Sequence, residues 1–210
     1  MKKNIYTFMV LISLSLMSYY PVKAQGKLKL LNGKELHIEK YMIDTSASMF
    51  YYKLKLPSGK LKKHAVMTDD IFSLIDSTGL EQILYTSSDT SDLSVNEMRH
   101  YVKGYGTANR EHEPWWAMAG GFAMGAGGMM VSKNPFFSPL IPVAYVGSIA
   151  LVKPDKSCIV WEHPEFEGDE DFIYAYQRSA RNKNMKYAII GSAEGIVVGA
   201  LIGILTGYYN

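Results

Sequence analysis

The side chains that most often carry catalysis or bind metals are scattered through this 210-residue sequence. No two of the five histidines stand at the spacing of metal ligands, and His112 lies between two acids whose side chains would point to different sides of a helix or loop. The sequence contains neither a Gly-x-Ser-x-Gly nucleophile turn nor a phosphate-binding loop. We therefore expect no enzymatic activity, no catalytic residue, no cofactor and no metal site.

Acidic residues supply two less specific candidates. Five acids fall within residues 165–171, and carboxylates bind Ca²⁺, although this spacing differs from an EF-hand loop. The same acids would suit a helix N-terminus, where the helix dipole favours negative charge. Glu194 is the one ionisable residue inside a long apolar segment, which makes it a candidate intramembrane functional acid. Snorkelling to the membrane surface, or pairing with a nearby base such as Lys186, explains Glu194 equally well.

Glycines recur at every fourth residue near the end of the chain. In water, each interior glycine costs a helix about 1 kcal/mol relative to alanine. Such a row makes sense where bare backbone packs against another surface, as small residues do between membrane helices. Ala117, Gly121 and Gly125 form a matching row in an earlier segment, and a second copy of the last helix is the alternative partner. The expected helix-packing residues are Gly121, Gly125, Gly191, Gly195, Gly199, Gly203 and Gly207.

The elements that must position these residues begin with an export signal. Residues 1–24 combine a basic start, a short apolar run and small residues before Gln25, which predicts a secretory signal peptide cleaved after Ala24. An uncleaved anchor is the alternative. Cys158 is the only cysteine, which excludes an intramolecular disulfide. No cysteine stands directly after the apolar run, so lipoprotein processing is not expected.

Residues 25–90 predict a small β-domain. Six short apolar runs are separated by turns, and Asn32-Gly33 is the strongest two-residue hairpin signal. This pattern favours a small antiparallel β-barrel or sandwich. Lysines gather on two neighbouring strands, which favours a solvated face over an anionic ligand or a lipid surface. They are Lys53, Lys55, Lys60, Lys62 and Lys63.

Helices are expected over the rest of the chain. Residues 91–113 predict a capped helix and linker, because Ser94-Val-Asn-Glu97 is a capping box; we expect this helix to end near Gly104 or Gly106. Residues 114–152 form an apolar helical hairpin that either spans a membrane or re-enters it. Residues 153–186 form a polar loop and amphipathic helix, and residues 187–209 a glycine-zipper transmembrane helix. The predicted fold class is α+β, with a small β-barrel or sandwich followed by a glycine-rich membrane region of three apolar helices.

The two glycine-rich helices also have similar approaches. Ala108 precedes Gly120 by 12 residues, and Ala180 precedes Gly191 by 11 residues, with tyrosines and basic residues around each alanine. Repeated units of this kind often pack as a pair. Chance similarity between two membrane-entry helices is the alternative.

This layout resembles uncharacterised exported bacterial envelope proteins with a signal peptide, a small β-domain and glycine-rich membrane helices. The row from Gly191 to Gly207 also resembles the glycine-zipper segments of bacterial outer-membrane lipoproteins, which carry a lipidated cysteine that is missing here. The resemblance implies envelope membrane association through helix packing, and it implies no catalytic residue.

We therefore expect a non-catalytic, membrane-anchored cell-envelope protein. Its β-domain would lie on the exported, periplasmic side and bind a partner, while its glycine rows drive helix packing or assembly. The alternative is a small pore, or a component of a transport or secretion complex, with the Glu194 helix lining a path. The expected partners are membrane lipid and an envelope protein or a second copy of this chain; a net charge of +2 is too small to argue for nucleic acid. Basic residues between the second and third apolar segments contradict the positive-inside rule, so the hairpin re-enters or the host membrane is the outer one.

Overall fold

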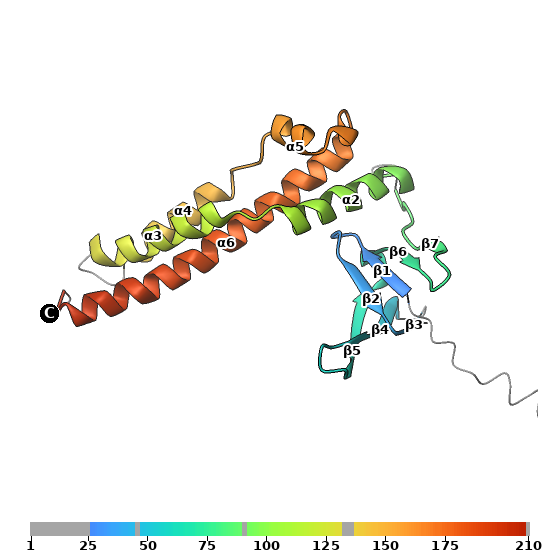
Figure 1. The fold of residues 1–210 in the computed structure, drawn as a ribbon, viewed down its shortest axis with the longest axis horizontal. Helices are drawn as coiled ribbons and strands as arrows, with labels where there is room; N and C mark the ends of the chain where they lie inside the picture. The colour runs from blue at the N-terminus through green and yellow to red at the C-terminus, as the bar shows by residue number, and fades with distance from the viewer. Residues whose placement is uncertain (1–25, 45–46, 90–91, 132–136, 209–210) are drawn as a thin grey trace, which may run out of the picture.

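The computed structural model describes residues 26–44, 47–89, 92–131 and 137–208. The expected signal peptide, residues 1–24, lies outside them. The described chain is α+β, as predicted: a β-domain stands beside one end of an elongated group of helices (Figure 1).

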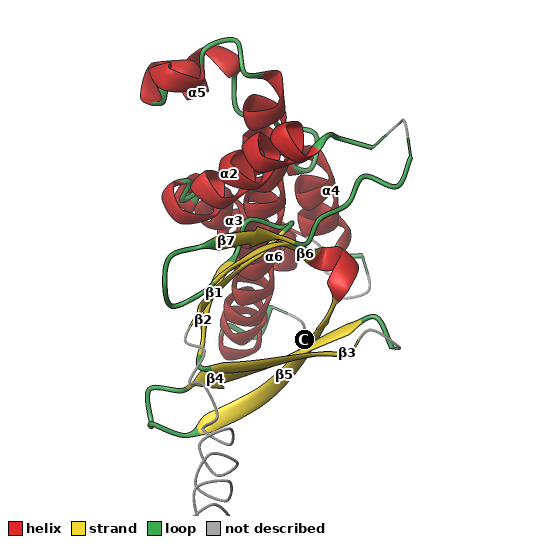
Figure 2. Ribbon diagram, turned by 90° about the vertical axis from the view of Figure 1, so that its right-hand side faces the viewer, coloured by secondary structure: helices red, strands yellow, loops and turns green. Residues whose placement is uncertain are grey.

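The β-domain consists of two antiparallel sheets, with strand orders β2-β1-β6-β7 and β3-β4-β5. Neither sheet closes, so the barrel alternative is wrong. Buried side chains from both sheets, including Leu28, Phe50 and Leu74, form one core. Figure 2 shows the four-stranded sheet between the helices and the three-stranded sheet. The strands are β1 (Gly26–Leu30), β2 (Glu35–Ile38), β3 (Lys40–Asp44), β4 (Met49–Lys55), β5 (Leu61–Met67), β6 (Ile71–Ile75) and β7 (Glu81–Ile83).

Local sequence explains the turns and the first helix. Gly33 has a φ of +70°, a conformation that glycine adopts without strain, and the Asn32-Gly33 turn joins the antiparallel pair β1–β2 as predicted. The capping box is also confirmed: Ser94 Oγ accepts from Glu97 N at 3.3 Å, and Glu97 Oε2 accepts from Ser94 N at 2.7 Å. The expected end of this helix near Gly104 or Gly106 is wrong, because the helix continues through both glycines to Glu111.

The helices are α2 (Val95–Glu111), α3 (Trp115–Val131), α4 (Leu140–Ile149), α5 (Lys156–Glu162) and α6 (Glu170–Leu205), with short 3₁₀ turns at Thr68–Asp70 and Pro164–Phe166. The expected amphipathic helix and glycine-zipper helix are one continuous helix, α6, of 36 residues. At about 1.5 Å per residue it is about 54 Å long. α2 and then α3 run along α6 in the same direction, since Gly104 meets the backbone of Phe172 and Gly125 meets that of Ser192.

One helix among the described residues, α6, is long and apolar enough to cross a membrane. The expectation of three such helices is wrong. α4 has only 10 residues, or about 15 Å, against an apolar layer of about 30 Å. Its N-cap is Pro139, and proline lacks the backbone N–H that a longer helix would use. α3 has 17 residues and ends at Val131; the segment that joins it to α4 lies outside the described residues.

Candidate functional site

The closest approach between helices is a glycine seam, which we define as Gly121 and Gly125 of α3 with Gly191, Gly195 and Gly199 of α6. A Cβ added at Gly191 would overlap the carbonyl oxygen of Met118, and one added at Gly195 would overlap that of Phe122. At Gly199 the added atom would lie 2.8 Å from Ala126 O, still far inside van der Waals contact. Backbone therefore packs directly on backbone along this seam.

The seam is reciprocal. Added Cβ atoms on α3 would meet α6 in the same way: at Gly121 the carbonyl of Ala188, and at Gly125 that of Ser192. The two helices make equivalent contacts. Adding 70 to the number of an α3 residue gives the equivalent residue of α6, since 121 + 70 = 191 and 125 + 70 = 195. Two copies of one helical unit packed side by side would produce this arrangement.

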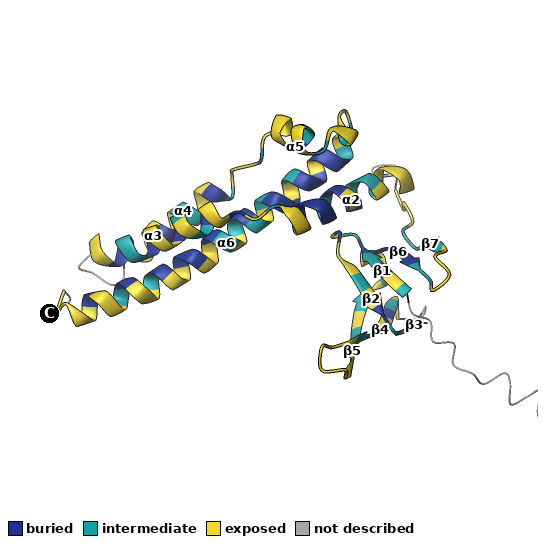
Figure 3. Cartoon of the chain, viewed as in Figure 1, coloured by how far each residue is buried: buried dark blue, intermediate teal, exposed yellow. Residues whose placement is uncertain are grey.

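The facing sides of α3 and α6 are largely buried and their outer sides largely exposed (Figure 3). The buried positions hold mostly small residues, and the exposed positions hold many large apolar residues. Ala117 and Ala188 are fully buried beside the seam glycines. By contrast, Val131 is 76% exposed, Leu151 82% and Leu205 85%. A water-soluble helix pair normally buries its large apolar side chains, so this distribution is reversed.

The last two residues of the expected packing row, Gly203 and Gly207, lie at the C-terminal end of α6. Gly203 is buried on α6, and its carbonyl accepts the N–H of Tyr208 at 2.9 Å. Gly207 lies beyond the helix, after the cap residue Thr206, with a φ of +67° and its own N–H on Ile204 O at 3.2 Å. This pair of bonds is a Schellman motif, which ends helices at a left-handed glycine. Gly207 therefore terminates α6.

Glu194 lies on an exposed face of α6 outside the glycine seam. Its carboxylate makes no ion pair with Lys186 or with any other described residue. Within one chain it therefore does not line a path between α3 and α6.

The polar half of α6 packs against α2. A Cβ at Gly104 would overlap the carbonyl oxygen of Phe172, which explains why α2 carries a glycine in mid-helix. Buried Asn184 lies with its Oδ1 2.7 Å from His112 Nε2. Burial, followed by the charges of nearby acids, raises the pKa of Tyr176 to about 12. This half is held by buried aromatic and polar contacts, unlike the glycine seam.

The acidic run at residues 165–171 serves the start of α6. Asp169 caps the helix, its Oδ1 accepting from Phe172 N at 3.0 Å, and its other oxygen pairs with His100 Nδ1. Glu170 pairs with Lys156 at 2.5 Å. Within the described ranges, no three His, Cys, Asp or Glu side chains meet in an arrangement that could hold a metal ion.

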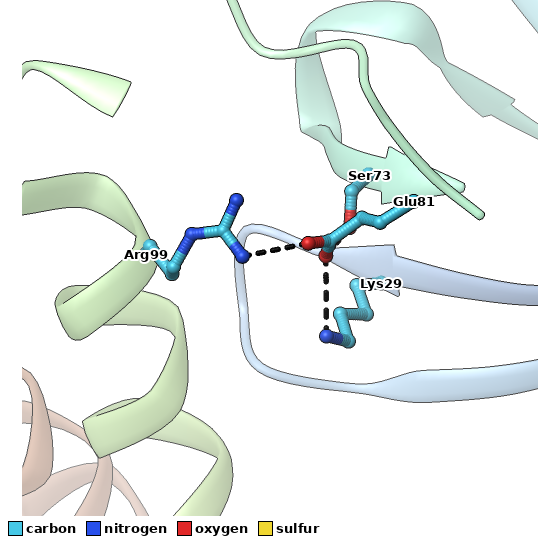
Figure 4. Close-up of polar contacts among 4 residues, drawn as sticks. All are labelled: Lys29, Ser73, Glu81 and Arg99. Carbon is cyan, nitrogen blue, oxygen red and sulfur yellow. Dashed lines mark hydrogen bonds and ion pairs between the residues drawn. The ribbon is translucent and has the colours of Figure 1, made fainter. Parts of the chain in front are cut away.

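A half-buried carboxylate joins the β-domain to α2 (Figure 4). Glu81 of β7 accepts from Ser73 Oγ at 2.8 Å and lies 3.2 Å from Lys29 Nζ and 2.6 Å from Arg99 NH1 of α2. Burial opposes the charged form, but these three donors outweigh it and hold the pKa of Glu81 below its usual range. Arg99 also lies over the ring of Phe72, 5.6 Å from its centroid.

The β1–β2 turn makes a second junction with α2. A Cβ at Gly33 would lie 2.6 Å from Gly106 Cα, and one at Gly106 would lie 2.8 Å from Gly33 O. Asn109 Nδ2 donates to Asn32 O at 3.2 Å. Gly106 therefore gives this turn room to dock, which accounts for the second glycine inside α2.

Between these junctions lies a cleft of about 610 Å³, which we call the tyrosine cleft. Tyr101 accepts from Arg178 NH1 at 3.1 Å, and Tyr105 accepts from Asn182 Nδ2 at 3.1 Å. Burial raises the pKa of Tyr101 against the opposing charge of Arg178. Burial and neighbouring acids raise the pKa of Asp171, which also lines the cleft. The cleft thus offers aromatic faces and hydrogen-bonding groups, as binding sites do.

The lysines form a row across the three-stranded sheet. Lys40 pairs in register with Lys53, and Lys53 with Lys63. None of the three makes an ion pair with a described residue. Like charges directly opposite one another destabilise a sheet, so the row lowers the stability of the β-domain at low salt.

No protein-family model matches the chain, and neither do any curated proteins or solved structures. The sequence patterns did not predict the tyrosine cleft or the Glu81 junction, because the residues that form each of them lie far apart in the chain. The repeated Tyr-and-base pattern before each glycine row was the one available signal for the cleft, since Tyr105 and Arg178 belong to it.

Proposed function

We propose that this chain is a non-catalytic, membrane-anchored protein of the bacterial cell envelope. The apolar half of α6 crosses the membrane, and the α3–α4 hairpin enters beside it and packs on the glycine seam. The β-domain lies on the exported side, where it binds a partner.

The observation that carries this proposal is the reversed distribution of small and large residues around the glycine seam. Full burial of one large apolar side chain contributes about 1.5–3 kcal/mol in water, so a soluble helix pair would place such residues inside. In lipid the outside is already apolar, and helices associate through small residues that allow close backbone packing. Val131 and Leu205, both more than three-quarters exposed, suit the second environment.

The dimensions and the flanking residues agree with a membrane. Residues 187–205 extend for about 28 Å, close to the apolar thickness of about 30 Å. Trp115 and Tyr187 meet edge to face at the start of this segment, with ring centroids 5.8 Å apart. Trp116 beside them is 51% exposed. Aromatic residues collect at this level of a bilayer, and Lys183 and Lys186 come just before it, where lipid phosphates lie.

We assign partner binding to the tyrosine cleft. It lies at the junction of the β-domain with α2 and α6, on the polar side of the proposed membrane surface. Tyr174 is 57% exposed at its edge and within ring contact of Tyr101. Tyrosine supplies a large contact area together with a hydrogen-bonding group, which suits recognition of a partner.

Membrane fractionation of cells that produce the full chain tests the proposal. The chain should remain in the membrane pellet after alkaline carbonate extraction, which removes peripheral proteins. The double substitution Val197→Arg and Leu201→Arg should release the chain from the membrane pellet or block its insertion into the membrane. Recovery of the unsubstituted chain in the carbonate supernatant would contradict the proposal.

A further inference from the structure

An uncovered groove along α3 and α6 mirrors the groove that α4 partly fills. α4 contacts Gly120 and Gly128 of α3, and a pocket of about 280 Å³ lies between α4 and Ile189 and Ala193 of α6. The same difference of 70 gives the equivalent positions on the opposite side of the helix pair. Gly120 and Gly128 correspond to Ile190 and Val198 of α6, since 120 + 70 = 190 and 128 + 70 = 198. Ile189 and Ala193 correspond to Ala119 and Ala123 of α3, since 189 − 70 = 119 and 193 − 70 = 123. All four are exposed. We call them, together with Glu194, the uncovered groove.

Glu194 lies in the middle of this groove. Ile190, Glu194 and Val198 stand four residues apart and therefore share one face of α6. Glu194 is seven residues beyond Tyr187, or about 10 Å below the proposed membrane surface. At that depth a carboxyl group requires a hydrogen-bonding partner, because lipid tails provide none. None of the described residues forms an ion pair with Glu194.

We propose that the uncovered groove binds a second copy of this chain, with the protonated Glu194 carboxyl of one copy donating a hydrogen bond to the Glu194 carboxyl of the other. This inference rests on the proposed membrane anchoring. Copies inserted in the same direction carry Glu194 at the same depth, so the second copy always presents a matching group there. A twofold axis along the membrane normal relates the two grooves and makes the interface self-complementary. Ala119 and Ala123 leave space for the close approach that this geometry needs.

Cysteine cross-linking of the full chain in membranes tests the interface. Ile190→Cys and Val198→Cys are each introduced with Cys158→Ser, which removes the only native thiol. Mild oxidation should then yield covalent dimers at both positions. Ile189→Cys is the matched control: Ile189 is also apolar and is 52% exposed, but it lies on the side of α6 that faces α4.

Substitution of the acid completes the test. In the Val198→Cys background, Glu194→Val should weaken association about tenfold, whereas Glu194→Gln, which keeps donor and acceptor groups, should retain most of the dimer. Equal cross-linking at positions 189 and 198, or an unchanged dimer yield with Glu194→Val, would overturn the interface. A monomeric chain that still resists carbonate extraction would overturn this inference alone, whereas a chain that carbonate extracts would overturn the proposed anchoring as well.

Discussion

Alanine at Gly195 is the most informative change in the glycine seam. In an isolated helix it would stabilise by about 1 kcal/mol. Here the new Cβ would overlap Phe122 O and lie 2.9 Å from Ala126 N, both backbone atoms that cannot rotate away. Restoring contacts of about 3.5 Å requires the helices to separate by about 1 Å, which forfeits a quarter to a half of the dispersion energy along the seam. We expect a net loss of about 1–3 kcal/mol.

Gly127→Ala is the matched control on α3, because a Cβ there meets nothing within 4 Å. It should raise the midpoint of thermal unfolding in detergent micelles, measured by circular dichroism, while Gly195→Ala lowers it. Gly195→Ile should lower it further, since its larger side chain needs a wider gap. If Gly195→Ala and Gly127→Ala raised the midpoint equally, close backbone packing at the seam would be refuted.

Three further predictions concern titrating groups outside the membrane. The pKa of Glu81 is lowered from 4.5, so its stabilising effect is present above that pH and disappears as the pH falls through the folded value. Glu81→Gln should therefore lower the unfolding midpoint at pH 7, and the difference from the unsubstituted chain should shrink as the pH falls below 4.5. The pKa of Asp171 is raised from 3.8, so its charged form is unfavourable in the folded state. Asp171→Asn should therefore raise the unfolding midpoint at pH 7, and a lower unfolding midpoint would contradict this prediction. The raised pKa of Tyr176, about 12, predicts one phenol that ionises at a higher pH than the others. In an absorbance titration, Tyr176→Phe should remove an ionisation step near pH 12 and leave those near pH 10 unchanged. The folded state should also lose stability as the pH rises from 10 toward 12.

Local patterns predicted the parts of the fold that local interactions determine. The capping box needs only Ser94 and Glu97, and the first hairpin needs only Asn32-Gly33, so both could be predicted from a few residues. The end of α2 could not. Gly104 and Gly106 weaken a helix when considered alone, but each accepts close backbone from another element, and that compensation is visible only in three dimensions.

The functional site likewise has features that local spacing predicts and contacts that only the folded chain brings together. Four-residue glycine spacing predicted which residues could allow close packing, because a helix places such positions on one face. It did not distinguish Gly199, which lies in the seam, from Gly207, which ends the helix. Glu81 and Arg99 are 18 residues apart, and Tyr101 and Arg178 are 77 apart. No periodicity connects such pairs, so neither the junction nor the cleft could be predicted.

Counting the thiols that one side of a membrane exposes tests the central claim most directly. Cys158 is exposed on α5, at the polar end of the helices, and Thr206 follows the last residue of α6 at the other end. In sealed vesicles that contain the full chain with Thr206→Cys, a membrane-impermeant maleimide should add one label to each molecule, whichever way the molecule is inserted. Intact-mass measurement should then find two labels only after detergent opens the vesicles. Two labels on each molecule in sealed vesicles would place both ends of α6 on one side and contradict the membrane-spanning role.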